Sequence, residues 1–363
     1  MSGWVFHAPF IHLHDGFELY AVWERNKKLA QEQYPAIISY SSYEELLAND
    51  AIELIIVNTP NNTHYTLAKQ ALLANKHVVV EKPFTISVAE GEELIEIAKD
   101  KNRKLSVYQN RRFDSDYLTI QDVLEKKLLG EIVEAEFHFD RYSETLSYKV
   151  HKETPGQGTG NLYDLGAHLI DQALQLFGYP KAILADITAM RNISKVDDYF
   201  ELILFYENKL RVRIHSTYLA REASIGYIFH GTKGSFIKPK TNVQEIALVN
   251  KQLPNEANWG VEPEAEWGLL HTEQNGVIVR EKIPSKTGQY MNYYNGMYDA
   301  IVHNKNVPVT AEDGLAVVKI IEAAYVSNAE RKVIDLWEGT LFNIQKINNF
   351  FSHFCISINF AMP

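Results

Sequence analysis

A lysine at the end of an apolar segment is the first residue whose position suggests chemistry. The β-branched run His77–Val80 is followed by Glu81, Lys82 and Pro83. Such a run is typical of a buried strand, and open α/β sheets bind ligands beyond the carboxyl ends of their strands. Pro83 favours an extended backbone at Lys82. The pattern therefore places an ammonium group where ligands bind, with an ordinary surface lysine as the alternative.

Asp164 and His168 form the second candidate group. They are four positions apart in a segment with helical apolar spacing, so they share one face of a helix. A carboxylate in that position can fix the imidazole tautomer and raise its basicity, as a general base for a carbinol proton requires. The alternative is a carboxylate near a helix start and a histidine satisfied in the core.

The composition narrows the class of protein. The 363 residues, 46% hydrophobic and 23% charged, are typical of a globular chain with room for two domains. The net charge of −10 argues against nucleic acid or an anionic membrane as partner. No secretory signal or membrane-spanning run is found, and the single cysteine, Cys355, fits a reducing compartment, so we expect a cytoplasmic protein.

The N-terminal part alternates short apolar strands with helical segments. This pattern predicts βαβ units and a mostly parallel sheet. Strands are expected at 18–23, 37–40, 54–57, around Val78 and at 105–108.

The first residues depart from this pattern, because Gly3 leads directly into a helix with no strand before it. A dinucleotide fingerprint needs a strand, a Gly-x-Gly-x-x-Gly turn and an acidic residue about 20 positions beyond the last glycine. Gly3 could be that last glycine and Glu24 the acidic residue, although Glu24 could equally be a solvated strand end. Arg25 is the type of residue that binds a 2′-phosphate, so NAD and NADP both stay open.

Five motifs give the chain a resemblance to a known family. They are Phe-His-Ala-Pro at 6–9, Asn-Thr-Pro-Asn-Asn-Thr-His at 58–64, Glu-Lys-Pro-Phe at 81–84, Gln-Asn-Arg-Arg at 109–112 and Tyr-Asp-Leu-Gly-Ala-His at 163–168. From Met1 to about Leu336 the chain resembles the Gfo/Idh/MocA family of NAD(P)-dependent oxidoreductases, close to its Phe-His-Ala-Pro branch. Against the family pattern, the first strand and the first two fingerprint glycines are absent, which favours a mis-called or truncated start. Because that strand is central in the doubly wound order, its loss would leave a gap in the sheet.

The resemblance, together with the pattern, predicts an α/β plus α+β organisation. Residues 1–114 would form a Rossmann-like, doubly wound parallel-sheet domain that lacks its first strand. Residues 115–336, with long alternating segments from Ile132 onward, would form an open-faced, mostly antiparallel sheet that binds substrate and builds a homo-oligomer. Residues 337–363 are an atypical tail that we expect to be poorly ordered; pairing of its Ile356 segment into the sheet gap is a further hypothesis.

The resemblance also implies the roles of individual residues. Lys82, Asp164 and His168 would meet over the nicotinamide as the catalytic group. His168 would take the hydroxyl proton of a sugar, polyol or related hydroxy compound, and Lys82 would stabilise charge on the reacting oxygen. Cofactor contacts are expected from Gly3, Glu24, Arg25, Thr59, Pro60, Asn61, His64, Glu81, Lys82 and Asn110. Substrate contacts are expected from Lys82, Arg111, Tyr163, Asp164 and His168.

The remaining motifs of the sequence predict neither a phosphate loop nor a metal site. The glycines of 156–160 have Gly-x-Gly-x-Gly spacing without a preceding strand, so they predict close backbone approach rather than a phosphate loop. His12 and His14 lack a carboxylate or cysteine partner set, so no metal site is expected. A non-catalytic NAD(P)-binding redox sensor and an oligomeric scaffold of the same fold remain as alternatives to the dehydrogenase.

Overall fold

The computed structural model describes residues 2–24, 28–222 and 224–336. The expectations for Arg25 and for the tail at 337–363 lie outside these residues. None of the described helices is long and apolar enough to cross a bilayer.

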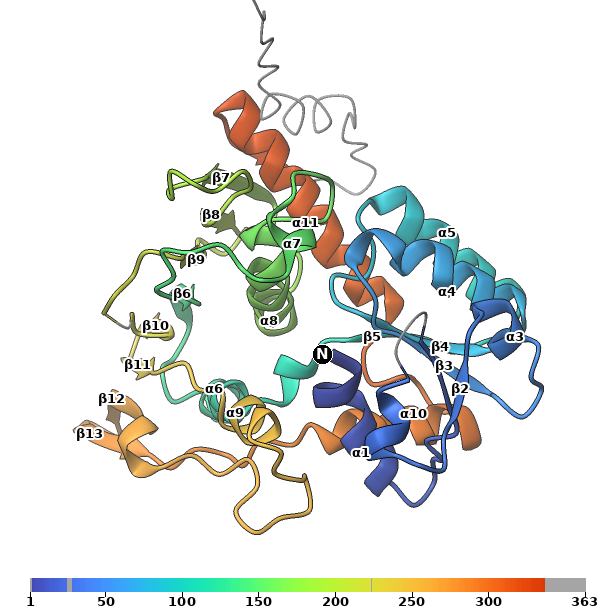
Figure 1. The fold of residues 1–363 in the computed structure, drawn as a ribbon. Coiled ribbons are helices and arrows are strands. Elements are labelled where there is room, and N and C mark those ends of the chain that lie inside the picture. Colours follow the sequence, from blue (N-terminus) through green and yellow to red (C-terminus); the bar gives the residue numbers. More distant parts are fainter. Residues whose placement is uncertain (1, 25–27, 223, 337–363) are drawn as a thin grey trace, which may run out of the picture.

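Two small parallel sheets form the N-terminal half (Figure 1). In one, β1 (Ala21–Trp23) pairs with β2 (Ile38–Tyr40). In the other, β4 (His77–Glu81) lies between β3 (Leu54–Val57) and β5 (Leu105–Tyr108). Within the described residues no strand connects the two sheets. The gap that the sequence predicted in a doubly wound sheet is therefore confirmed.

The three-stranded sheet is buried because helices cover both of its faces. Figure 1 shows α4 (His64–Leu73) and α5 (Val88–Asp100) on one side, and α1 (Ala8–Leu13) and α10 (Met291–Val302) on the other. The central β4 residues Val78–Val80 are completely buried. Continuous apolar strands of this kind are expected where both faces of a parallel sheet are covered.

The chain enters this half through a helix, as the sequence predicted. The π-helix Gly3–His7 runs directly into α1. Short helices α2 (Ala30–Gln33) and α3 (Tyr43–Leu47) complete this half. Side chains of Ser42 and Ser87 cap α3 and α5 by accepting hydrogen bonds from the amides of the first turn.

A nine-stranded sheet forms the second half, in the order β13-β12-β11-β10-β6-β9-β8-β7-β14. All neighbours are antiparallel except β6 and β9, which are parallel. This confirms the mostly antiparallel second sheet. The strands are β6 (Ile132–His138), β7 (Ala182–Thr188), β8 (Tyr199–Phe205), β9 (Arg211–Thr217), β10 (Tyr227–Gly231), β11 (Gly234–Lys238), β12 (Gly268–Gln274), β13 (Val277–Ile283) and β14 (Ile334–Asp335).

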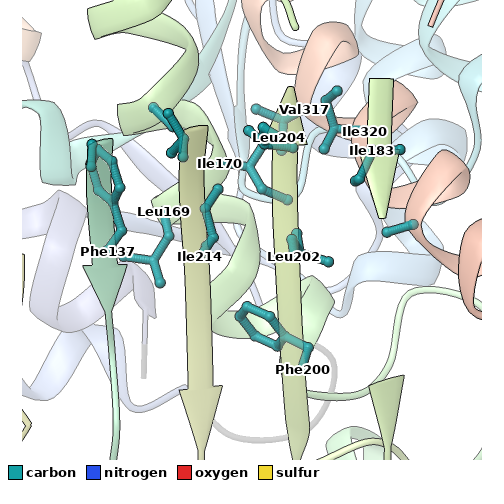
Figure 2. Close-up of a cluster of buried hydrophobic side chains, with 14 of the residues drawn as sticks. Phe137, Leu169, Ile170, Ile183, Phe200, Leu202, Leu204, Ile214, Val317 and Ile320 are labelled. Atoms are coloured by element: carbon teal, nitrogen blue, oxygen red, sulfur yellow. The ribbon is translucent and has the colours of Figure 1, made fainter. Parts of the chain in front are cut away.

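Helices cover one face of this sheet. Figure 1 places α6 (Ser115–Glu125) and α8 (Ala167–Phe177) on its inner side, and none of the described helices on its outer side. Figure 2 shows Phe137 of β6 and Ile214 of β9 directed toward Leu169 and Ile170 of α8. Since side chains alternate along a strand, the next residues point to the uncovered outer face.

One long helix serves both cores. Helix α11 (Ala311–Glu330) packs Leu315 and Val318 into the N-terminal core. The same helix packs Val317 and Ile320 into the core of the nine-stranded sheet. Thr310 and Asp313 form a reciprocal capping box at its start. The packing therefore crosses the predicted boundary at residue 114.

Candidate active site

Lys82 connects the two halves of the molecule. It follows β4, and its Nζ donates to the main-chain oxygen of Asp164 at 2.7 Å and to the Asp164 carboxylate at 3.1 Å. The two side chains are 15% and 21% exposed. Burial lowers the pKa of Lys82 below its ordinary value, and the Asp164 charge opposes that shift. The strand end and the helix expected to meet therefore do meet.

A second lysine binds the other oxygen of the same carboxylate. Lys152, in the short helix α7 (Val150–Glu153), donates to Asp164 Oδ2 at 2.7 Å. Burial raises the pKa of Asp164, but the positive charges of Lys82 and Lys152 outweigh burial and hold that pKa well below its usual range. Asp164 is consequently ionised at neutral pH. No spacing pattern in the sequence predicts this contact of Lys152, because the contact depends on how the loop before α7 folds.

His168 lies in the first turn of α8 and is 5% exposed. Burial and the nearby charges of Lys82 and Arg111 hold its pKa well below the ordinary value, so the imidazole is neutral at pH 7. Its Nδ1 is buried and has no hydrogen-bond partner among the described residues. A neutral, unpartnered imidazole nitrogen can accept a proton.

The expected pairing of Asp164 with His168 is wrong in one respect. In the part of the chain that the structure describes, the Asp164 carboxylate binds the two lysines and no hydrogen bond joins it to His168. Asp164 lies in a π-helix, Leu162–Gly166, that precedes α8, and the ammonium groups take both of its oxygens. The carboxylate therefore orients Lys82 rather than the imidazole.

Glu81 connects the end of β4 to the N-terminal helix. Its carboxylate accepts hydrogen bonds from Ser2 and from His7, whose Nε2 is 3.0 Å away. The other His7 nitrogen lies 2.7 Å from the Tyr294 hydroxyl. Burial raises the pKa of Glu81, but the bonds from His7 and Ser2 outweigh burial and lower it to about 2. His7 belongs to the Phe-His-Ala-Pro motif, but its position in that motif did not predict the contact with Glu81.

The loops after β3 and β4 are held together by His64. Its two ring nitrogens lie 2.9 Å from the Pro83 carbonyl and 3.0 Å from the Thr59 carbonyl, and the side chain is completely buried. Because both nitrogens are engaged within the protein, His64 positions these loops, in place of the direct cofactor contact expected for it. Thr59 also receives a hydrogen bond from Thr63 at 2.7 Å.

Asn61 and the glycine-rich loop form a second contact between the halves. Asn61 Nδ2 donates to the Gly158 carbonyl at 2.7 Å. Gly158 has a φ of +80°, and a Cβ there would lie 2.4 Å from the Ile86 side chain. The prediction that these glycines allow close approach to a neighbour fits this contact. Pro60 precedes Asn61 in the same strand-end loop and begins its 3₁₀ turn.

Gly3 and Glu24 occupy the expected positions but contact protein groups. A Cβ on Gly3 would lie 2.4 Å from Asn58 Nδ2, so the helix start packs against the end of β3. Glu24, directly after β1, accepts hydrogen bonds from the amides of Leu29 and Ala30 and from Ser39. In this structure its carboxylate therefore binds the backbone amides at the start of helix α2.

Two of the residues expected to bind substrate are engaged elsewhere. Tyr163 is 1% exposed and donates to the Ile86 carbonyl at 3.1 Å, so the expected substrate contact is wrong for its hydroxyl. Arg111 is buried and binds Asp114 at 3.2 Å and Glu245 at 2.7 Å. Its positive charge still acts on His168. Asn110 is also buried, in the 3₁₀ turn after β5.

The residues present fit the nicotinamide end of a dinucleotide. Lys82, Glu81 and Asn110 lie at the ends of adjacent parallel strands, where open α/β sheets bind nucleotides. His168 Nδ1 and Gln109 Oε1 are buried polar atoms without a hydrogen-bond partner among the described residues, as expected of groups that face a ligand. The Gly-x-Gly part of the phosphate-binding turn is not found in the sequence before β1.

Comparison with known proteins covers almost the whole described chain. Residues 1–109 match the Gfo/Idh/MocA model described as oxidoreductase family, NAD-binding Rossmann fold. Residues 121–336 match the model described as oxidoreductase family, C-terminal alpha/beta domain.

Individual relatives match the chain over most of their length. The chain is 37% identical over 336 residues to scyllo-inositol 2-dehydrogenase (NADP(+)) of Bacillus subtilis, covering 93% of each chain. It is 38% identical over 356 residues to an uncharacterised oxidoreductase of Schizosaccharomyces pombe, covering 93% of this chain and 97% of the relative. The crystal structure of an oxidoreductase from Bacillus cereus superimposes with a TM-score of 0.87 at 30% identity, over 94% of this chain and 97% of the other.

Proposed function

Because the chain belongs to the Gfo/Idh/MocA family and is an NAD(P)-dependent dehydrogenase, we propose that it interconverts a carbinol and a carbonyl on a polyol or sugar. The observation that carries the proposal is the contact of Lys82 with Asp164 one helical turn before His168. A redox sensor or a scaffold, the two alternatives that the sequence left open, would not need this group.

A nicotinamide cofactor, when bound, would supply the hydride acceptor or donor. Lys82 donates a hydrogen bond to the reacting oxygen and stabilises the negative charge that develops there during oxidation. Asp164 and Lys152 hold the ammonium in place, since Asp164 is fixed at both oxygens. Such positioning matters because a preorganised donor need not reorient during the reaction.

His168 takes the hydroxyl proton during oxidation and returns it during reduction. Its neutral state at pH 7 and its unpartnered Nδ1 support this role. Glu81, Thr59, Pro60, Asn61 and Asn110 would border the cofactor through the strand-end loops. Gly3 and Glu24 would lie toward its adenosine half, as the matching positions do in a Rossmann-like fold.

A hydride-transfer assay tests the proposal. Purified protein is mixed with NAD⁺ or NADP⁺ and a panel that contains inositols, glucose 6-phosphate and aldoses, and reduced nicotinamide is followed by absorbance. The relatives named for scyllo-inositol and glucose 6-phosphate oxidation motivate the panel. We expect turnover with at least one polyol or sugar. Cofactor binding without turnover on any member would favour the sensor.

The outer face of the nine-stranded sheet supports a second proposal, that copies of the chain associate through it. No described helix covers this face (Figure 1), and Val277 and Ile278 of β13 are 62% and 65% exposed at its edge. Light scattering coupled to size-exclusion chromatography should give a mass above that of the monomer. A monomeric mass at micromolar concentration would contradict this assembly.

A further inference from the structure

Two histidines and an aspartate gather on the outer face of the nine-stranded sheet. His138 ends β6, and His215 is its register partner in the parallel strand β9. Their chain neighbours Phe137 and Ile214 point into the core toward α8, so the imidazoles point to the opposite face. Asp140 lies two residues beyond His138. This cluster is therefore separated by the sheet from the group on α8.

The three side chains are spaced like ligands of one ion. Asp140 Oδ1 is 3.0 Å from His215 Nδ1, and Asp140 Oδ2 is 3.7 Å from His138 Nδ1. One ligand atom from each residue lies within 4.8 Å of the others. Two ligands held at about 2.0 Å by a tetrahedral ion are roughly 3.3 Å apart. Small side-chain movements would close the set around one ion.

His138 already has the arrangement that supports a metal-binding imidazole. Its Nδ1 is buried and has no hydrogen-bond partner in the described chain. Its Nε2 lies 3.0 Å from Glu136 Oε2, and Arg213 donates to Glu136 at 2.6 Å. A carboxylate that binds the far nitrogen of an imidazole leaves the lone pair on the near nitrogen, as it does behind many metal-binding histidines.

We propose that His138, Asp140 and His215 bind one divalent transition-metal ion of the zinc class, with a fourth position open. Two imidazole nitrogens and one carboxylate oxygen suit such an ion better than magnesium or calcium, which prefer oxygen ligands throughout. The ion would tie the end of β6 to β9. It would take no part in hydride transfer, because it lies across the sheet from Lys82 and His168.

The carboxylate of the cluster lies between the two imidazoles. Its Oδ1 is 3.0 Å from His215 Nδ1 and its Oδ2 is 3.7 Å from His138 Nδ1. Asp140 also accepts a hydrogen bond from the Thr217 amide at 3.0 Å, which fixes one of its oxygens.

The alternative to a metal ion in this cluster is a proton on His138. His138 Nε2 lies 3.0 Å from Glu136 Oε2 and His138 Nδ1 lies 3.7 Å from Asp140 Oδ2, so each ring nitrogen faces a carboxylate. The protonated imidazole would then bridge two carboxylates. Glu201 and Tyr199 of β8 also face His215, as its register partner and as a ring 5.3 Å away, and Arg213 adds a positive charge beside Glu136. A metal site should bind added zinc, whereas a cluster bridged by a proton should not.

Zinc titration of the untagged full-length protein, stripped with EDTA, tests the proposal. Isothermal calorimetry should show one equivalent of Zn²⁺ bound per chain, and bound Zn²⁺ should raise the thermal midpoint because it binds only the folded site. Asp140→Asn keeps an oxygen that can accept from Thr217 but removes the negative ligand. Asp140→Asn and His215→Ala should each weaken zinc binding about tenfold or more, and Glu136→Gln, which acts through His138, by about tenfold.

A matched control and a second readout keep the test decisive. His271→Gln removes an exposed histidine from β12 of the same sheet and should leave zinc binding unchanged. Co²⁺ in place of Zn²⁺ should give the visible absorption of a bound, low-coordinate ion in the wild type and not in Asp140→Asn. If the stripped protein binds no zinc, or if Asp140→Asn binds it as well as the wild type, the cluster is a proton-bridged ionic group and the metal proposal fails. None of these readouts depends on dehydrogenase activity.

Discussion

The Lys82 ammonium and the Asp164 backbone carbonyl are 2.7 Å apart, although the two residues come from different halves of the molecule and lie 82 positions apart in the sequence. One side chain follows a parallel strand and the other precedes the helix that carries His168. This hydrogen-bonded group thus connects the N-terminal half to the half that carries His168, as the Asn61–Gly158 contact also does.

Replacing Lys82 with Ala should lower kcat/KM by about 10²–10³-fold, because the donor to the reacting oxygen is lost. The fold should persist, since Asp164 keeps its contact with Lys152. Steady-state hydride transfer and a thermal melt measure the two effects. Lys69→Ala, which breaks a surface pair with Glu93, is the control and should keep full activity. A Lys82→Ala enzyme within tenfold of wild type would contradict the assigned role.

The pH profile of the wild type should stay flat as the pH falls through 6.5. The pKa of His168 is held well below 6.5 by burial and by the charges of Lys82 and Arg111, so the base takes up a proton only at more acidic pH. His168→Asn should lower kcat/KM by about 10²–10⁴-fold. It should also abolish the fall in kcat/KM that protonation of His168 causes at pH values well below 6.5. An acid limb near pH 6.5 that survives the substitution would assign it to another group.

Asp164→Asn should move the alkaline limb of kcat/KM to lower pH. The Asp164 charge raises the pKa of Lys82 against the lowering effect of burial, so removing that charge lets the lysine lose its proton earlier. The profile of kcat/KM against pH measures this directly. Asp122→Asn, which alters an aspartate paired with Lys126 and Lys286, should leave the limb in place. A limb that does not move would show that Lys82 is not the titrating acid.

Tyr163→Phe should reduce stability rather than substrate affinity. The change leaves the Ile86 carbonyl without its donor, which costs about 1–2 kcal/mol of unfolding free energy. KM should stay within about twofold of wild type, because the hydroxyl is buried against that carbonyl. Urea unfolding and steady-state kinetics give the two values. A large rise in KM without loss of stability would restore the substrate contact expected from the sequence; Tyr179→Phe, at an exposed tyrosine, is the control.

The contribution of Glu81 to stability should depend on pH. Its pKa is about 2 in the folded chain and 4.5 as an ordinary side chain, so the unfolded chain binds the proton more readily. The stabilisation, about 3 kcal/mol at most, is complete above pH 4.5 and is lost as the pH falls toward 2. The difference in unfolding free energy between wild type and Glu81→Gln should therefore shrink below about pH 4.5. A difference that stays constant as the pH falls from 4.5 toward 2 would contradict the His7–Glu81 pairing.

The local apolar pattern of the sequence was sufficient to predict the strands that carry the site. Leu54–Val57 and Leu105–Tyr108 are strands with the predicted bounds, because buried parallel strands are continuously apolar. The hairpin of β12 and β13 was not predicted, since β13 is largely exposed and carries three charged residues. Asn275-Gly276, both with positive φ, is nevertheless the turn signal that could have identified it.

Strand ends and helix faces could predict which residues of the site lie near one another, but not which hydrogen bonds they form. Strand ends and motif spacing predicted that Lys82 and Asp164 lie close together, and the two residues are hydrogen-bonded. These patterns could not show that Asp164 would turn toward two lysines, because that depends on the π-helix before α8 and on the loop that carries Lys152. Burial of Tyr163 and His64 against main-chain carbonyls likewise depends on tertiary packing.

Because α11 lines both hydrophobic cores, neither half can lose its structure while the other stays whole. Melting of this helix withdraws Leu315 and Val318 from one core and Val317 and Ile320 from the other at the same moment. The molecule should accordingly denature in one cooperative calorimetric transition, and a cavity cut into α11 should lower the melting temperature of the whole chain rather than loosen one half.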